Sequence, residues 1–213
     1  DRDDTGFARG TEGERVELTC SLGEVRRSRL EDTAGALEAF RQTLVLSPSH
    51  ARSRRALEEL LADEGARREA ATILRPLYEA DGEDEKLLKV LDIEIENEGG
   101  TREKLALLSQ AATVAESKLS DPARAFAYTS AGLSAAAGED DLPDWLARAE
   151  RLVERTGDHA GYVRLLEKVA PDVLDEERQL GILLRTGELA RDRLADRELA
   201  KATYKKALDL RAD

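Results

Sequence analysis

Apolar residues recur at helical spacing along most of the chain. Between residues 101 and 119 they fall three or four positions apart, which places them on one face of a helix. The same face returns 75 residues later. The two sets are Leu105, Leu108, Ala112, Ala115 and Leu119, then Leu180, Leu183, Gly187, Ala190 and Leu194. Alternating strand patterns are nearly absent, so the sequence predicts an all-α protein.

Turn and capping residues divide the chain into about eleven predicted helices. Asp121 before Pro122 predicts a helix start, because its carboxylate can cap free amides and proline tolerates the first turn. Gly82 and Gly157 predict helix ends. The expected segments are 12–29, 32–46, 50–63, 66–80, 83–98, 101–119, 121–137, 141–156, 158–173, 175–194 and 196–212. Short connections between them favour antiparallel neighbours.

Small residues form three triplets with a common internal spacing of 13 and then 7 residues. They are Gly23, Ala36 and Thr43, then Ala112, Ala125 and Gly132, then Gly187, Ala200 and Ala207. Small side chains at fixed points of two successive helices let the helices approach closely, so the triplets predict repeated helical hairpins. The first triplet precedes the second by 89 residues rather than 75, and we assign the excess to a helix at 50–63. Either that helix packs irregularly or the superhelix changes there. We also expect Ala66 to be exposed.

Specific residues of the first and last hairpins resemble tetratricopeptide repeats. The first carries Leu22-Gly23, Ala36, Phe40 and Pro48, and the last carries Gly187, Ala200, Tyr204, Ala207 and Leu208. The middle hairpin has Thr129 where an aromatic residue is expected, with Tyr128 beside it. The resemblance implies a right-handed superhelical solenoid of antiparallel helix hairpins. We expect a disordered or extended segment over 1–11, then one solenoid over 12–213 that belongs to a longer array.

In proteins that look like this, the first helix of each hairpin lines a concave groove that holds a peptide or helix of a partner. Carried over to this sequence, the resemblance implies groove positions at Cys20 and at eight further residues. Those eight are Glu24, Arg27, Ser109, Thr113, Glu116, Leu184, Glu188 and Arg191. The paired Asn and Lys that grip a terminal carboxylate in chaperone-binding members stand at none of these positions, which excludes that subtype.

Composition narrows the classes of partner. The net charge is −12 at pH 7, and an acidic surface repels phosphate backbones, so we expect neither nucleic acid nor an anionic membrane as a partner. Two short segments, 26–29 and 52–55, are instead rich in arginine. The longest uncharged apolar stretches are too short to cross a bilayer. Because Cys20 is the only cysteine, an intrachain disulfide and a multi-cysteine zinc site are excluded.

The sequence favours a scaffold over an enzyme. His50 and His159 stand at expected helix starts, where capping or exposure explains them, and we predict no catalytic residue, metal or cofactor. A glycosidase built from helical hairpins is the strongest enzymatic rival, but such grooves use stacking aromatics, and aromatics make up only 4% of this chain. Trp145 is expected to be a packing anchor. We therefore predict a non-catalytic scaffold that binds a peptide or helix of a partner protein, with self-assembly as the alternative. We expect it in the cytoplasm, with the periplasm left open.

Overall fold

The computed structural model describes residues 11–211, which contain eleven α-helices and no β-strand. The expected all-α fold is confirmed, and each helix begins within one residue of its predicted start. The chain divides into two compact units, one ending at Asn97 and the other beginning at Glu98. The extended segment expected over 1–11 lies, apart from Thr11, outside the described residues. One continuous solenoid over 12–213 stays a prediction.

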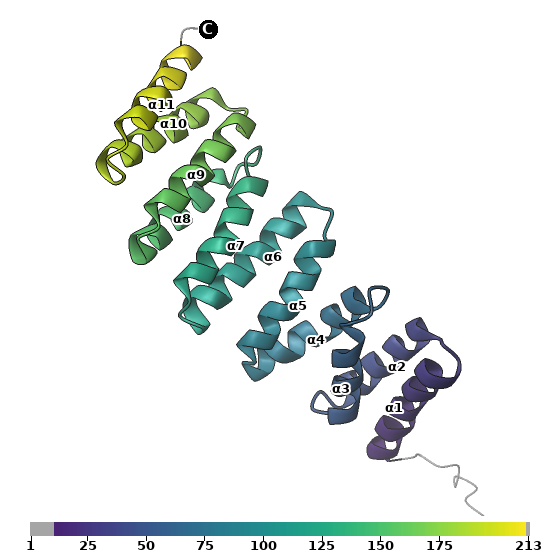
Figure 1. Cartoon of the computed structure of the whole chain (residues 1–213). Helices are drawn as coiled ribbons and strands as arrows, with labels where there is room; N and C mark the ends of the chain where they lie inside the picture. Colours follow the sequence, from purple (N-terminus) through teal and green to yellow (C-terminus); the bar gives the residue numbers. More distant parts are fainter. Residues whose placement is uncertain (1–10, 212–213) are drawn as a thin grey trace, which may run out of the picture. The chain divides into compact units, whose positions relative to one another are not determined.

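The first unit contains five helices that pack in order along the chain (Figure 1). They are α1 (Glu12–Arg29), α2 (Thr33–Leu46), α3 (Ala51–Leu60), α4 (Arg67–Asp81) and α5 (Asp84–Asn97). Helix α3 contacts α1 as well as its chain neighbours, and α4 contacts α2, so these four helices alternate between two layers. The additional helix expected at 50–63 is therefore α3, and it packs regularly.

The second unit contains six α-helices arranged as three successive hairpins (Figure 1). They are α6 (Thr101–Thr113), α7 (Pro122–Ala135), α8 (Leu142–Thr156), α9 (His159–Val169), α10 (Glu176–Asp192) and α11 (Arg197–Leu210). A π-helical turn, Val114–Lys118, extends α6, and a 3-10 turn, Ala170–Asp172, ends α9. We call α6, α8 and α10 the entry helices, because each opens a hairpin.

Aspartates start all three second helices of these hairpins. The Asp121 carboxylate accepts the backbone N–H of Arg124 at 2.9 Å, and Asp196 accepts that of Leu199 at 2.9 Å. These bonds satisfy amides that have no partner within the helix. The predicted cap at Asp121 is thus confirmed, as are the helix ends at Gly82 and Gly157, which adopt left-handed backbone with φ of 69° and 75°.

The small-residue triplets lie where helices meet closely. A Cβ added to Gly23 would meet the Phe40 ring at 2.7 Å, and one added to Gly187 would meet the Tyr204 ring at 2.5 Å. The middle hairpin differs, because a Cβ added to Gly132 would overlap the ring of Trp145, which belongs to the next helix. Trp145 is 5% exposed, which confirms it as a packing anchor.

One burial expectation is wrong. Ala66, expected to be exposed, is wholly buried at the start of α4. It follows the turn at 61–65, and its backbone N–H donates to Asp63 O while its carbonyl accepts from Ala70 N. A side chain at the start of a helix can point inward whatever the polarity of its sequence neighbours.

Candidate interaction surface of the second unit

Long arginines bridge successive entry helices of the second unit. Arg148 of α8 donates to the carbonyl of Ser109 at 3.3 Å and to the hydroxyl of Thr113 at 3.1 Å, both on α6. Arg185 stands 37 residues later on α10 and donates to the Glu150 carboxylate of α8 at 2.7 Å. The two arginines thus make the same kind of bridge between successive entry helices.

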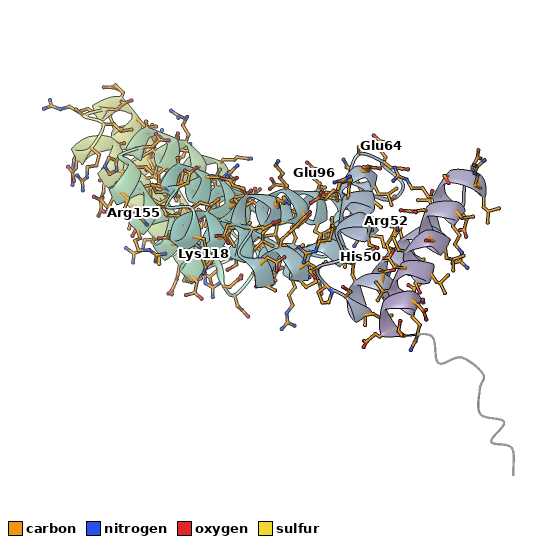
Figure 2. All side chains as sticks on the ribbon, turned by 90° about the horizontal axis from the view of Figure 1, so that it is seen from below. His50, Arg52, Glu64, Glu96, Lys118 and Arg155 are labelled. Atoms are coloured by element: carbon orange, nitrogen blue, oxygen red, sulfur yellow. The ribbon has the colours of Figure 1, made fainter. Side chains whose placement is uncertain are left out.

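Glu116 gathers three arginines in the π-helical turn that extends α6. Its carboxylate lies 2.9 Å from Arg155, 3.2 Å from Arg151 and 3.5 Å from Arg148, and its side chain is only 14% exposed. Burial alone would raise the pKa of Glu116, but the hydrogen bond and charge of Arg151, with the charges of Arg148 and Arg155, lower that pKa overall. Arg155 is labelled in Figure 2. The cluster ties α6 to α8.

Two equivalent hollows open between these bridged helices. The hollow between α6 and α8 has a volume of about 670 Å³, and the hollow of α8, α9 and α10 about 460 Å³. Residues 37 apart line both: Leu105 and Leu142, Ser109 and Leu146, Asp141 and Arg178, Trp145 and Ile182, Arg148 and Arg185. The same architectural position therefore occurs twice with different chemistry.

The α6–α8 hollow is polar and mostly acidic. Glu139, Asp140, Asp141 and Asp144 line it together with Arg102 and Arg148. Two of its buried polar atoms, Oδ1 of Asp141 and Nε of Arg148, have no protein hydrogen-bond partner. Such atoms contribute less to the stability of the fold than paired ones do, so they favour a ligand or water at this position.

The hollow of α8, α9 and α10, which we call the α8–α10 cleft, is mainly apolar, with the charged side chains of Glu150, Arg178 and Arg185 also in its lining. Its lining includes Leu142, Leu146, Leu166 and Ile182. Tyr162 of α9 is 1% exposed, lines this hollow, and its hydroxyl has no hydrogen-bond partner in the protein. Burial, together with the negative charge of Glu150, raises the pKa of Tyr162. The hydroxyl therefore stays protonated and can act as a hydrogen-bond donor.

A second, smaller hollow of about 280 Å³ adjoins this cleft. The two share Ala147, Glu150, Tyr162 and Arg185, so the Glu150–Arg185 ion pair stands on the rim where they meet. His159 lines the smaller hollow, and its buried Nδ1 also lacks a partner. Tyr162 thus lines both hollows.

Most residues that the repeat resemblance singled out in the second unit lie outside these hollows. Ser109, Thr113 and Glu116 are bound by the arginines of α8, and only Ser109 lines a hollow. Leu184 is 43% exposed on α10, where Glu188 pairs with Arg185 at 3.4 Å. Arg191 pairs with its neighbour Asp192 at 2.7 Å.

The predicted groove positions of the first unit serve contacts between α1 and α3. Cys20 is wholly buried, so its place as a groove residue is wrong. Glu24 accepts from Arg52 at 2.5 Å, and Arg27 donates to Glu59 at 2.8 Å. His50 caps α3 by accepting the backbone N–H of Ser53 at 3.3 Å. Both His50 and Arg52 are labelled in Figure 2. Glu24 and Arg27 are therefore both engaged in ion pairs with α3.

Sequence reasoning missed Tyr162, Leu146 and Ile182. A signal for them was present, because Ala112, Ala149 and Gly187 stand 37 and then 38 residues apart and are all buried on entry helices. The 75-residue repeat is therefore two shorter repeats. The middle copy of the shorter repeat was not recognised, because Tyr162 stands where the copies on either side have the small residues Ala125 and Ala200.

The sequence matches no protein-family model and none of the curated proteins. Among residues 11–211, no group of three or more His, Cys, Asp or Glu side chains is placed to hold a metal ion. Nor does any helix in that range combine the length and the apolar character needed to cross a membrane.

Proposed function

We propose that the chain is a divergent tetratricopeptide-like scaffold whose second unit binds a segment of a partner protein in the α8–α10 cleft. One observation carries this proposal: an almost fully buried tyrosine with an unpartnered hydroxyl lines an open, mainly apolar hollow. Buried polar groups in proteins are nearly always hydrogen-bonded. An apolar side chain of the partner would fill the cleft, and a carbonyl or amide oxygen beside it would accept from Tyr162.

The neighbouring hollow indicates the charge of the partner segment. Asp144 is exposed on the acidic wall of the α6–α8 hollow and has no ion-pair partner among the described residues. A basic side chain is the natural complement of such a wall. We therefore propose a partner segment with one large apolar residue for the α8–α10 cleft and a lysine or arginine for the α6–α8 hollow. The proposed role is binding alone, without catalysis.

Gly181 provides a direct test. It lines the α8–α10 cleft, and a Cβ added there would meet no atom within 4 Å. Gly181→Leu should therefore fill the cleft without disturbing the core, whereas Gly181→Ala leaves most of it open. Glycine also costs helix stability relative to either residue, so both variants should fold.

Peptides selected from a random display library on the purified wild-type protein would serve as probes. The proposal expects peptides that share an apolar and a basic position and bind Gly181→Ala like wild type. Gly181→Leu should weaken them by at least about tenfold, which corresponds to about 1.4 kcal/mol. Selected peptides that bind wild type and Gly181→Leu equally would show that the cleft is not the binding site.

A further inference from the structure

Helix α1 has a second apolar face that no described residue covers. Its buried residues Val16, Cys20 and Gly23 face the rest of the first unit. Leu18, Leu22 and Val25 are 71%, 46% and 48% exposed, and their spacing of four and three residues places them together on the opposite face. Three large apolar residues on one exposed helical face are more than scattered surface residues account for.

Charged residues at the two ends of this face are complementary. Glu14 lies one turn before Leu18, and Arg29 lies one turn after Val25, so both share the face with the apolar residues. Arg29 has no ion-pair partner among residues 11–211. Glu14 uses one carboxylate oxygen to accept the N–H of Thr11 at 2.8 Å and leaves the other open to a partner.

The order of these residues is symmetric about the middle of the helix. Leu18 and Val25 are equally far from the point between Ser21 and Leu22, and so are Glu14 and Arg29. If a second copy of α1 lay antiparallel on this face, Leu18 would meet Val25 of the other copy. In the same register each Glu14 would meet an Arg29. A two-fold interface needs a surface that is complementary to itself in this way.

We propose that the outer face of α1 pairs two copies of this chain through an antiparallel α1–α1 contact. The pairing is separate from the proposed partner cleft, which belongs to the other unit. A face one helix wide is small, so the contact belongs to the weak, reversible class of interfaces.

Sedimentation velocity over a concentration series from about 1 µM to about 1 mM would measure the association, a range that spans weak binding. The proposal expects a monomer that converts to a dimer and no further. Leu22→Asp should abolish the dimer. Val45→Asp is the matched control, because Val45 is 75% exposed on α2 and lies outside this face. A wild-type monomer throughout, growth beyond the dimer, or a dimer that survives Leu22→Asp would overturn the proposal.

A charge exchange tests the antiparallel register itself. In its own dimer, Arg29→Glu sets two carboxylates against each other at both ends of the contact, and Glu14→Lys sets two cations against each other there. Mixed together, the two variants form only attractive pairs, so each should be monomeric alone and the mixture should dimerise like wild type. Circular dichroism would confirm that both variants are folded. Equal behaviour of each variant alone and in the mixture would contradict the antiparallel contact.

Discussion

Two glycines of α10 allow a test, within one helix, of whether the small-residue triplets mark close contacts between helices. Gly181 and Gly187 are both interior residues of α10, six positions apart. An added Cβ at Gly181 meets nothing within 4 Å, whereas one at Gly187 meets Cε1 of Tyr204 at 2.5 Å and Cζ at 2.8 Å. Alanine at either site gains the same intrinsic helix propensity, so the difference between the two variants isolates the contact with α11.

The expected magnitudes follow from these distances. Gly181→Ala should raise the free energy of unfolding by about 0.5 to 1 kcal/mol, which is the usual gain in a helix interior. Gly187→Ala obtains the same gain but must displace a ring from sub-van der Waals distance, at a cost of about 1 to 3 kcal/mol. The two variants should therefore differ by about 1 to 3 kcal/mol, with Gly187→Ala the less stable.

Urea unfolding followed by tryptophan fluorescence would measure this difference. Trp145 is the only tryptophan, and it lies in the same unit as α10, so the signal reports the relevant transition. In a Tyr204→Leu background the extra cost of Gly187→Ala should largely disappear, because the ring that obstructs it is gone. Equal stabilisation by alanine at both glycines of the wild-type chain would refute the claim that the small-residue triplets mark close helix contacts.

Three further predictions concern burial and charge. Cys20 is wholly buried, and burial with the charge of Glu24 raises its pKa, so its thiol should react with Ellman's reagent only after the chain is unfolded. Glu116→Gln should lower the free energy of unfolding by about 1 to 3 kcal/mol at pH 7. Folding lowers the pKa of Glu116, so its contribution is present above the unfolded pKa and is lost as pH falls through the lower folded pKa. Wild type and variant should therefore converge in urea melts once the pH is below that folded pKa. Ala66→Leu and Ala125→Leu should both destabilise the chain by about 1 to 3 kcal/mol in thermal melts, since both alanines are wholly buried.

Helix positions could be predicted from the sequence because their signals are local. Caps such as Asp121 and Asp196 act within three residues of themselves, and the apolar period is read within one helix. Contacts between neighbouring helices were also within reach, since a small residue such as Gly187 implies a large partner on the helix that follows.

The candidate site depends on contacts that the sequence does not encode locally. Arg148 reaches Thr113 across 35 residues, and nothing near either residue shows that the arginine bends toward the earlier helix rather than into solvent. Of the groove residues inferred by resemblance, Ser109, Thr113 and Glu116 bind arginines of α8, and their place in a partner groove stays a prediction. Tyr162 was missed because the spacing of apolar residues along a helix is the same whether a tyrosine lies in the core or lines a cleft.

Ile182 reports directly on the proposed binding of a partner segment in the α8–α10 cleft of the second unit. The chain has four isoleucines, and Ile182 is the only one outside the first unit. A methyl NMR spectrum with labelled isoleucine therefore contains four signals, and Ile182→Val would assign the one from the cleft lining. On titration with a selected peptide, we expect the Ile182 signal to shift while the three others stay in place. Shifts confined to the other three signals, or binding without any shift at Ile182, would contradict it.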